Sequence, residues 1–268
     1  MDRTVVLPRA LQPVECGPLV RLGAERDGGY VVPAAAVAAS EVLLSFGLSA
    51  NWEFEKAFLA ARRAQGKGLV IHAYDHTVDA RSLRMYQLKS LVHFVRTGRR
   101  HFWDAARRAG GYGAFFDGRA ATHFKEMVAR DAGPGRASIE AIMGRIDADA
   151  RAFLSMDIEG DEYRVADALP GFAPRFAGMG IEFHDLDLQW DRLLAIHASL
   201  SEHLAVAHVH INNVGGLGPG GRPNLLEISY VARALVPGAL LPAQRRYPLG
   251  GLDQANAADL PDFAVEFA

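Results

Sequence analysis

The sequence predicts an α/β protein built on a mostly parallel sheet that ends in an antiparallel hairpin and carries helices on both faces. Short apolar runs typical of buried strands alternate with helical patterns along the chain, which favours parallel strands joined by right-handed crossovers. The last two apolar runs, 205–211 and 225–231, have a glycine-rich loop but no helical pattern between them. We therefore expect these two strands to pair antiparallel.

The composition is that of an ordinary globular protein. Half of the 268 residues are apolar, 22% are charged and the formal net charge is −2, so the total charge does not favour nucleic acid or an anionic membrane as a partner. The single cysteine, Cys16, excludes an internal disulfide and is expected to fill a small apolar space. No signal peptide or membrane-spanning run is recognisable, so we expect a soluble, cytoplasmic protein without a transmembrane segment.

Residues 1–40 are expected to form a lead-in that packs on a single domain, 41–268. Within the lead-in, Asp27-Gly28 predicts a tight turn into a short strand. The first half of the domain is then predicted to contain strands at 41–47, 68–75 and 114–116, a helix at 52–64, and a basic helical insertion of one or two helices at 81–108. In that insertion the apolar residues recur at the spacing of an amphipathic helix, namely Leu88, Leu91, Val92 and Val95.

The second half repeats strand and helix in turn. Ser138 predicts the N-cap of a helix that runs to about 146, and Pro170 is expected to stop a helix at 160–169. The other predicted elements are strands at 152–156, 177–183, 205–211 and 225–231, and a helical stripe of Leu193, Ile196, His197, Leu200 and Leu204.

Polar residues end several of the predicted strands, and in open α/β sheets ligands bind beyond these carboxyl ends. Gly47 permits a turn and a close backbone approach to a ligand. Asp75 could accept from two ribose hydroxyls, or it could serve only as a turn or capping residue.

The strand at 152–156 runs into four acids within six residues, Asp157, Glu159, Asp161 and Glu162. Asp157 and Glu159, still in extended geometry, should point the same way. Asp161 and Glu162 could do no more than stabilise a helix N-terminus.

The next two strands place further polar side chains at alternate positions. Glu182 shares a side with His184, and His208 shares one with His210 and Asn212. Two roles remain open: general base chemistry by His184 or Asp157, or a divalent Mg²⁺ or Mn²⁺ site. The candidate metal ligands are Asp157, Glu182, His184 and His210.

The basic insertion has eight Lys and Arg residues against one acid, Asp104. It is either a solvated amphipathic face or a lid over the sheet edge that binds an anionic acceptor, because guanidinium groups suit phosphate. The candidate acceptor contacts are Arg84, Lys89, Asn212 and Asn213.

These residues also give the chain a family resemblance. It resembles the FkbM-type S-adenosylmethionine-dependent methyltransferases, in a branch associated with polysaccharide biosynthesis. The matching motifs are Arg21-Leu-Gly23, Asp27-Gly-Gly-Tyr30, Leu44-Ser-Phe-Gly47, Ala73-Tyr-Asp75-His76, Asp157-Ile-Glu-Gly160-Asp-Glu-Tyr163, Ile181-Glu-Phe-His-Asp185, His208-Val-His-Ile-Asn-Asn213 and Leu226-Glu-Ile-Ser229.

The resemblance implies a Rossmann-like methyltransferase fold and O-methylation of a sugar hydroxyl. The expected acceptor is an anionic small molecule or glycan, and no nucleic-acid partner is expected. A homo-oligomer is compatible with this function. The implied catalytic residues are Asp157, Glu159 and His184, and the implied donor contacts are Asp27, Gly28, Tyr30, Ser45, Phe46, Gly47, Asp75 and His76.

The chain departs from the usual glycine-rich methyltransferase turn, of which it keeps Gly47 alone. A metal-dependent hydrolase or phosphotransfer enzyme, and a non-catalytic binding module on the same fold, are the alternatives.

Overall fold

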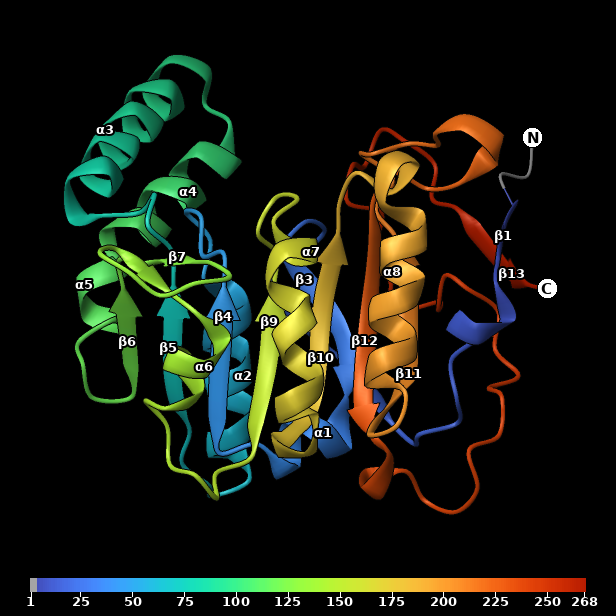
Figure 1. Ribbon diagram of the computed structural model, residues 1–268. Helices are drawn as coiled ribbons and strands as arrows, with labels where there is room; N and C mark the ends of the chain where they lie inside the picture. The colour runs from blue at the N-terminus through green and yellow to red at the C-terminus, as the bar shows by residue number, and fades with distance from the viewer. Residues whose placement is uncertain (1–3) are drawn as a thin grey trace.

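A central sheet of seven strands organises the computed structural model, which describes residues 4–268 (Figure 1). Its order is β11-β12-β10-β9-β4-β5-β6, and β12 runs antiparallel to both of its neighbours while the other adjacent pairs are parallel. The strands are β4 (Val42–Phe46), β5 (Val70–Tyr74), β6 (Ala121–Phe124), β9 (Ala152–Met156), β10 (Phe176–Phe183), β11 (Leu204–Ile211) and β12 (Leu226–Ala232). The predicted α/β class and the antiparallel pairing of the last two sheet strands are both confirmed.

Helices cover both faces of this sheet, as predicted (Figure 1). One face buries a cluster that includes Ile142 and Leu193, beneath α6 (Ile139–Met143), α7 (Glu162–Val165), the 3₁₀ helix η2 (Ala166–Arg175) and α8 (Leu186–Leu200). The other face packs on α1 (Ala34–Ala39) and α2 (Glu53–Ala64) through Val37 and Phe58. Burial of these two apolar layers is the main stabilising contribution to the fold.

The N-terminal segment forms two small strand pairs beside the main sheet. β2 (Leu19–Gly23) and β3 (Gly29–Pro33) make an antiparallel hairpin around the predicted turn at Gly28, and Ser229 of β12 donates a hydrogen bond to the carbonyl of Val31. β1 (Thr4–Leu7) pairs in parallel with β13 (Ala264–Phe267), which joins two segments from opposite ends of the sequence. The remaining short elements are β7 (Met127–Val128), β8 (Arg136–Ala137), η1 (Arg9–Leu11), η3 (Pro219–Gly221) and η4 (Arg233–Leu235).

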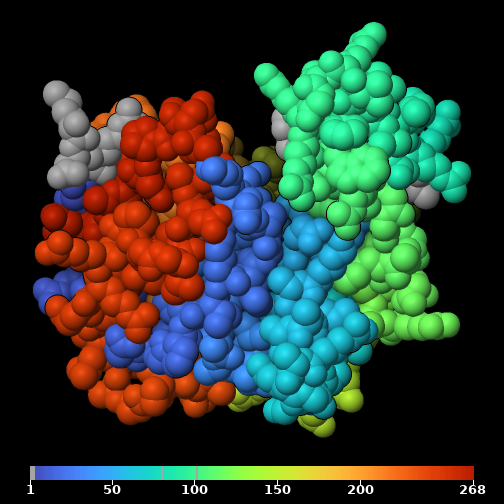
Figure 2. All heavy atoms as spheres, turned by 180° about the vertical axis from the view of Figure 1, so that it is seen from behind, coloured from blue at the N-terminus to red at the C-terminus, as the bar shows by residue number. Residues whose placement is uncertain are grey.

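The basic insertion is a helical hairpin that rises beyond the carboxyl ends of the strands (Figures 1 and 2). It consists of α3 (Ala80–Thr97) and α4 (Arg100–Gly110). Asp79 caps α3 by accepting from the Ser82 amide, and Gly98 ends it in the left-handed conformation at φ 66°. The rings of Phe94 and Trp103, 5.4 Å apart, hold the two helices together.

Several element predictions are wrong in ways that have physical causes. Residues 112–115 form the helical turn α5 (Tyr112–Phe115), because Phe116 and Tyr112 pack edge-on against Trp52. The strand of this region is instead β6, whose polar residues lack the apolar pattern by which a strand is predicted. The helix expected at 160–169 becomes α7 followed by the tighter η2, which runs through Pro170, while Leu204 begins β11.

The apolar stripe of the insertion faces solvent rather than a core. Leu88, Val92 and Val95 are 56%, 44% and 83% exposed, whereas Leu83 and Ser90, on the opposite side of α3, are buried. Cys16 is buried and unpaired, as predicted. Among the described residues, no helix combines the length and the apolar character needed to span a membrane.

Candidate functional site

Buried acids and histidines form a row along the carboxyl edge of the sheet. Strand register places Glu182 of β10 opposite Glu227 of β12, and Glu227 opposite His210 of β11. Asp157, directly after β9, continues the row on the other side of Glu182, because Met156 is in register with Ile181. A one-residue change of register would turn this row to the other face of the sheet.

A cluster around His184 lies at the Asp157 end of this row. His184 Nε2 lies 3.7 Å from Asp157 Oδ1 and 3.5 Å from Glu159 Oε2. His184 Nδ1 lies 3.0 Å from Glu162 Oε1. The Tyr163 hydroxyl donates to the His184 carbonyl at 2.6 Å, so both the ring and the backbone of this histidine are held.

Glu162 organises the turn that carries the cluster. Its Oε1 accepts from the amides of Ile158 and Gly160 as well as facing His184, and the residue is fully buried. Capping was one of the predicted roles of Glu162, and these contacts add the orientation of His184. The backbone around the cluster is strained, since Glu159 and Asp185 adopt positive φ angles of 56° and 50°. Such conformations cost free energy and concentrate at functional sites.

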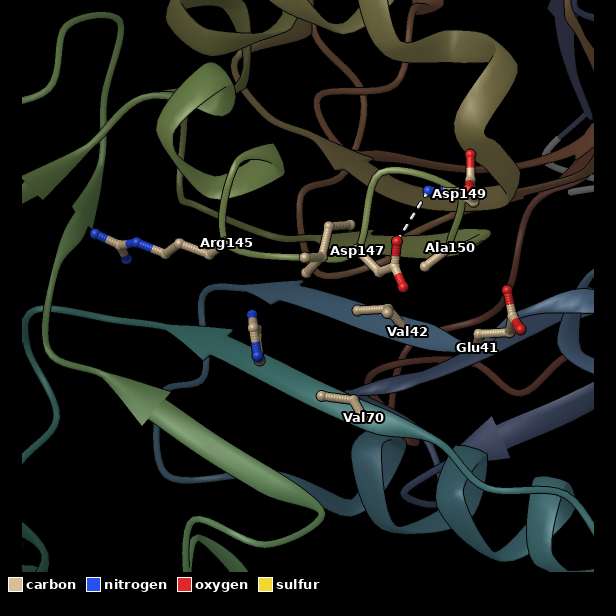
Figure 3. A pocket seen from close by; sticks show the side chains of 9 residues that line it. Glu41, Val42, Val70, Arg145, Asp147, Asp149 and Ala150 are labelled. Atoms are coloured by element: carbon tan, nitrogen blue, oxygen red, sulfur yellow. Dashed lines mark hydrogen bonds between the residues drawn. The ribbon is translucent and has the colours of Figure 1, made fainter.

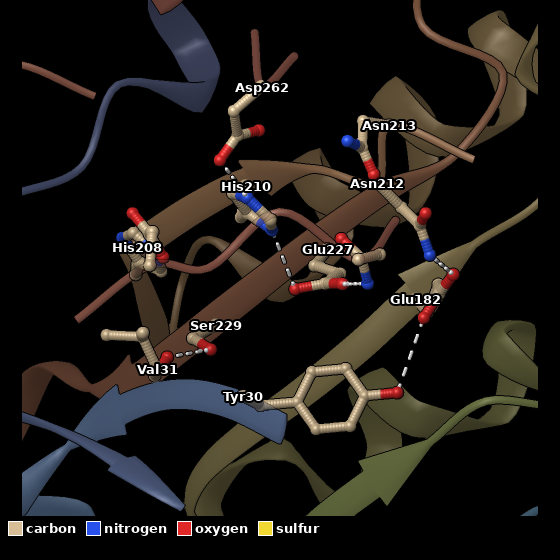
Figure 4. Close-up of polar contacts among 12 residues, drawn as sticks. Tyr30, Val31, Glu182, His208, His210, Asn212, Asn213, Glu227, Ser229 and Asp262 are labelled. Carbon is tan, nitrogen blue, oxygen red and sulfur yellow. Dashed lines mark hydrogen bonds and ion pairs between the residues drawn. The ribbon is translucent and has the colours of Figure 1, made fainter. Parts of the chain in front are cut away.

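Tyr30 and Asn212 contact Glu182 beside the cluster. The Tyr30 hydroxyl lies 3.3 Å from both Asp157 Oδ2 and Glu182 Oε2, and Asn212 Nδ2 donates to Glu182 Oε1 at 2.9 Å (Figure 4). Tyr30 was predicted as a donor contact and Asn212 as an acceptor contact. The structure places both beside the acid row, at Glu182.

The charges of the cluster shift one another's titration. Burial raises the pKa of Asp157 to about 7. The charge of His184 opposes this shift, and the charges of Glu159 and Glu162 add to it. Burial and the charges of Glu227 and Asp157 raise the pKa of Glu182 well above its usual range. Burial alone would lower the pKa of His184, but the hydrogen bond to Glu162 and the surrounding carboxylates raise it to about 9. At neutral pH, His184 is therefore a cation beside a partly ionised Asp157.

The same cluster has the donor set of a divalent metal site. Ligand atoms of Asp157, Glu159 and His184 lie within 4.8 Å of one another. Asp157 Oδ1 is shielded from solvent and has no hydrogen-bond partner among the described residues, which leaves an acceptor free for an ion. Oxygen and imidazole donors suit Mn²⁺ or Mg²⁺. Glu182, a predicted ligand, lies 3.9 Å from His184 Nε2 but is outside this group of three.

A cavity of about 260 Å³ opens beside the cluster. It is lined by four chain segments at the carboxyl ends of β4, β5 and β9 and at β7: Gly47 and Ser49; Tyr74, Asp75, His76 and Thr77; Glu126, Met127 and Val128; and Asp157, Ile158, Glu159 and Asp161. Asp157 and Glu159 belong to both the cavity and the His184 cluster. A molecule bound in the cavity would therefore end at that cluster.

Two of the predicted donor residues shape the cavity wall. Gly47 has φ 83°, and a Cβ on it would lie 1.6 Å from the carbonyl oxygen of Asp157, so no other residue fits there. Asp75 Oδ2 accepts from the amides of Leu48 and Ser49, and Oδ1 accepts from the amide and hydroxyl of Thr77. A carboxylate has about four acceptor positions, so Asp75 fixes the loop instead of offering free oxygens to a ribose.

Other predicted donor residues lie away from the cavity. The side chains of Ser45 and Phe46 are buried, and Ser45 donates to Glu55 beneath the sheet edge. Asp27 and Gly28 lie in the exposed turn between β2 and β3, where Gly28 approaches Asn51. His76 lines the cavity and is exposed.

His210 does not join the His184 cluster, contrary to the prediction. Its two ring nitrogens lie 3.3 Å from Glu227 Oε2 and 3.2 Å from Asp262 Oδ2 (Figure 4). Burial alone would lower the pKa of His210, but the Glu227 charge and the hydrogen bonds of both acids raise it to about 11. His208 similarly contacts Asp253 at 2.8 Å. These histidines fasten the C-terminal segment to the sheet.

The predicted acceptor contacts are also separated by the fold. Asn213 Nδ2 donates to the carbonyls of Ala257 and Leu260, so it holds the C-terminal segment. Arg84 and Lys89 lie exposed on α3. A second, larger cavity of about 460 Å³ lies at the amino ends of β4 and β5, beside Glu41, Val42 and Val70 (Figure 3). That end of the sheet is opposite to the one where ligands bind in this type of fold.

Sequence reasoning missed some residues of this site. Glu227 takes part in the row, and its signal was the acid inside the apolar run 225–231. Glu126, Met127 and Val128 reach the cavity from β7 and its approach, and no local pattern marked them.

No protein-family model matches the chain, and no curated protein sequence matches it. Three solved structures are similar in fold. A Streptococcus pneumoniae protein provisionally assigned as a tRNA (m1A22) methyltransferase is 10% identical with a TM-score of 0.34, covering 74% of this chain and 67% of that one. Precorrin-6y C5,15-methyltransferase from Geobacter metallireducens is 13% identical with a TM-score of 0.33, covering 74% and 83%. The 23S rRNA methyltransferase ErmE is 10% identical with a TM-score of 0.37, covering 76% and 70%. Likenesses this weak do not indicate an activity or a substrate for this chain.

Proposed function

We propose that this protein transfers a methyl group from S-adenosylmethionine to a sugar hydroxyl of a nucleotide-sugar or glycan acceptor, in the manner of the FkbM-type enzymes that its sequence resembles. The observation that carries the proposal is the shared position of Asp157 and Glu159, which line the cavity and also belong to the His184 cluster. A donor in the cavity would thus meet an acceptor at a group able to take its proton.

The donor side is supported by the sheet and by the cavity wall. A parallel sheet with one reversed strand, here β12, is the Rossmann variant used by many methyltransferases. Met127, Val128 and Ile158 offer an apolar surface for an adenine ring, beside the backbone of Gly47 and Ser49. The cavity is smaller than the ~300 Å³ at which ligand pockets typically start, so it would hold part of the donor and leave the rest along the sheet edge.

Asp157 is the base in this proposal. The acceptor oxygen forms a bond to the methyl carbon as the carbon–sulfur bond breaks, and the hydroxyl proton passes to Asp157 Oδ1, which accepts no hydrogen bond from the described residues. A base with a pKa of about 7 is well matched to neutral pH. His184 carries a proton already at this pH, so it positions Asp157 and stabilises its charge.

A divalent ion would be held by Asp157, Glu159 and His184. When bound, it would lower the pKa of the acceptor hydroxyl. Because an imidazole binds metal only when neutral, such binding would release the proton of His184. The metal-assisted reaction therefore predicts proton release on titration with Mn²⁺.

The first experiment measures donor binding without any acceptor. We expect S-adenosylhomocysteine to raise the melting temperature and to bind in calorimetry, because a ligand specific for the folded state stabilises it. Stabilisation by Mn²⁺ with none by S-adenosylhomocysteine would favour a metal-dependent hydrolase instead. No response to either would favour a binding module without catalysis.

The second experiment compares Asp157→Asn with Asp161→Asn, using radiolabelled S-adenosylmethionine and a panel of nucleotide sugars. Both residues line the cavity, but Asp161 pairs with the exposed Arg164 and is outside the His184 cluster. Loss of a general base costs about 100-fold or more in rate, so Asp157→Asn should be slowed by that factor while still binding S-adenosylhomocysteine. Equal rates for the two variants would refute the role of Asp157, and transfer to tRNA or rRNA in place of sugars would refute the acceptor class.

A further inference from the structure

The solvent-facing side of α3 carries an apolar stripe that nothing in the described chain covers. Met85, Leu88, Val92 and Val95 are 51%, 56%, 44% and 83% exposed. At 100° per residue these four positions span about 80° of the helix circumference. They therefore form one continuous surface, which we call the α3 stripe.

The α3 stripe faces away from the packing side of the hairpin. Leu83 and Ser90 are buried on the opposite side of α3, and Gln87 lies against Gly110 at the end of α4. The hairpin itself projects from the body of the molecule (Figure 2). The stripe is thus accessible to a large, flat partner.

Positive charge borders the stripe. On the helix, Arg84 lies on one side of it and Lys89 and Arg96 lie on the other, and all three are exposed. Residues 81–108 hold eight Lys and Arg and one acid, a net charge of +7, while the whole chain has a net charge of −2. The remainder of the chain therefore carries −9, and the molecule is strongly polarised.

We propose that the α3–α4 hairpin docks this protein onto an anionic lipid bilayer. Exposed aliphatic side chains flanked by Lys and Arg are the surface of an interfacial helix, whose apolar side enters the acyl boundary while its cations contact lipid phosphates. The exposed aromatic ring of Trp103, on the same hairpin, suits the headgroup region. The acidic body is repelled by the same lipids, so the hairpin approaches first.

Charge argues against two other occupants. A symmetric dimer through this face would place the Lys and Arg residues of one hairpin against the same residues of the second copy. These like charges would repel each other. Nucleic acid would satisfy the cations but would leave the aliphatic stripe in water. Docking would also bring the cavity near the membrane, because α3 begins three residues after Thr77, which lines the cavity.

The test is cosedimentation with vesicles, in the absence of donor and acceptor. We expect binding to vesicles of phosphatidylcholine and phosphatidylglycerol in a two-to-one mixture, weakened by salt, and little binding to phosphatidylcholine alone. Leu88→Ser with Val95→Ser should lower the affinity about tenfold or more. Arg84→Gln with Arg96→Gln should lower it about 10- to 30-fold.

The matched control is Leu241→Ser with Val6→Ser, which removes two exposed aliphatic side chains outside the hairpin, 63% and 58% exposed; it should bind like the wild type. Circular dichroism checks that every variant is folded. The proposal is overturned by absence of vesicle binding, by equal loss in the control, by a dimer that Val95→Glu dissociates, or by binding to RNA without binding to vesicles. None of these outcomes depends on methyl transfer.

Discussion

At the scale of single residues, the site concentrates carboxylates that the fold has partly removed from water. Asp157, Glu182 and Glu227 follow one another across three strands. Burying a charge disfavours its ionised form, which is why the pKa values of Asp157 and Glu182 rise together. The row is therefore expected to lower stability while it provides a base.

This leads to a prediction for Glu182→Gln. The folded-state pKa of Glu182 lies above its ordinary value of 4.5, so the folded state binds more protons than the unfolded state, and the stability of the wild type falls as pH rises above 4.5. Glutamine keeps an acceptor for Asn212 and has no charge to bury. We expect the variant to exceed the wild type in free energy of unfolding by about 1 kcal/mol or more at pH 8, since one unit of pKa shift is worth about 1.4 kcal/mol.

Urea unfolding at several pH values measures this difference, which should shrink toward pH 4.5. Glu202→Gln, at an exposed position, serves as the control and should change little at any pH. A Glu182→Gln variant that is less stable than the wild type at pH 8 would contradict the account.

At the scale of elements, the loop after β4 depends on one close approach. Gly47 packs against the carbonyl of Asp157, and Asp75 holds the following amides. Gly47, which was predicted to touch the donor, thus also makes a close contact between the ends of two strands. The cavity and the His184 cluster keep their relative position because the ends of β4 and β9 are joined here.

Gly47→Ala and Gly66→Ala should separate backbone strain from close contact. Both glycines have positive φ, 83° and 69°, but a Cβ at Gly66 meets no atom within 4 Å. Gly66→Ala should therefore cost about 1 kcal/mol. Gly47→Ala should cost at least about 3 kcal/mol, because the loop must shift away from the Asp157 carbonyl. Thermal and urea unfolding compare the two, and equal losses would show that the contact at Gly47 is unimportant.

At the scale of the whole molecule, the C-terminal segment is fastened across the sheet by polar contacts. His208 binds Asp253, His210 binds Asp262, and Asn256 donates to Glu227. The parallel pair of β1 and β13 lies beyond these contacts. Residues far apart in the sequence thus brace β11 and β12 and the polar row that they carry.

His210→Gln tests this bracing. The pKa of His210 is raised from its ordinary 6.5 to about 11, so its stabilising contribution is complete below pH 6.5 and is lost as pH rises toward 11. Removing one partner of a buried ion pair costs about 3 kcal/mol. We expect a loss of that order at pH 7 that becomes smaller by pH 10.

Urea unfolding measures the change in stability, and hydrogen exchange should show faster exchange in residues 249–267 of the variant. His203→Gln, at a half-buried position in the turn before β11, is the control. A loss that is constant with pH would show that the imidazolium charge does not contribute.

Local sequence patterns were sufficient for most of the sheet and for the centre of the site. The strands at 152–156 and 205–211 lie within a residue of their predicted bounds, because both are buried along their whole length and so carry near-continuous apolar runs. The proximity of Asp157, Glu159 and His184 followed from strand ends meeting at one edge. β6 was missed because an edge strand with Thr122 and His123 lacks that apolar signal.

The sequence by itself determined the alternation of strand and helix, the reversed last pairing and the acids and histidines that end the strands, since these depend on residue type and spacing along the chain. The tertiary structure alone decided which of those side chains meet. Strand register placed His210 opposite Glu227, the C-terminal segment brought Asp262 to the same ring, and the turn after β9 brought Asp157 beside His184. The tertiary structure also decided that the apolar stripe of α3 faces solvent. A helix buries the side that a neighbouring element covers, and α4 covers the side of α3 that carries Leu83 and Ser90.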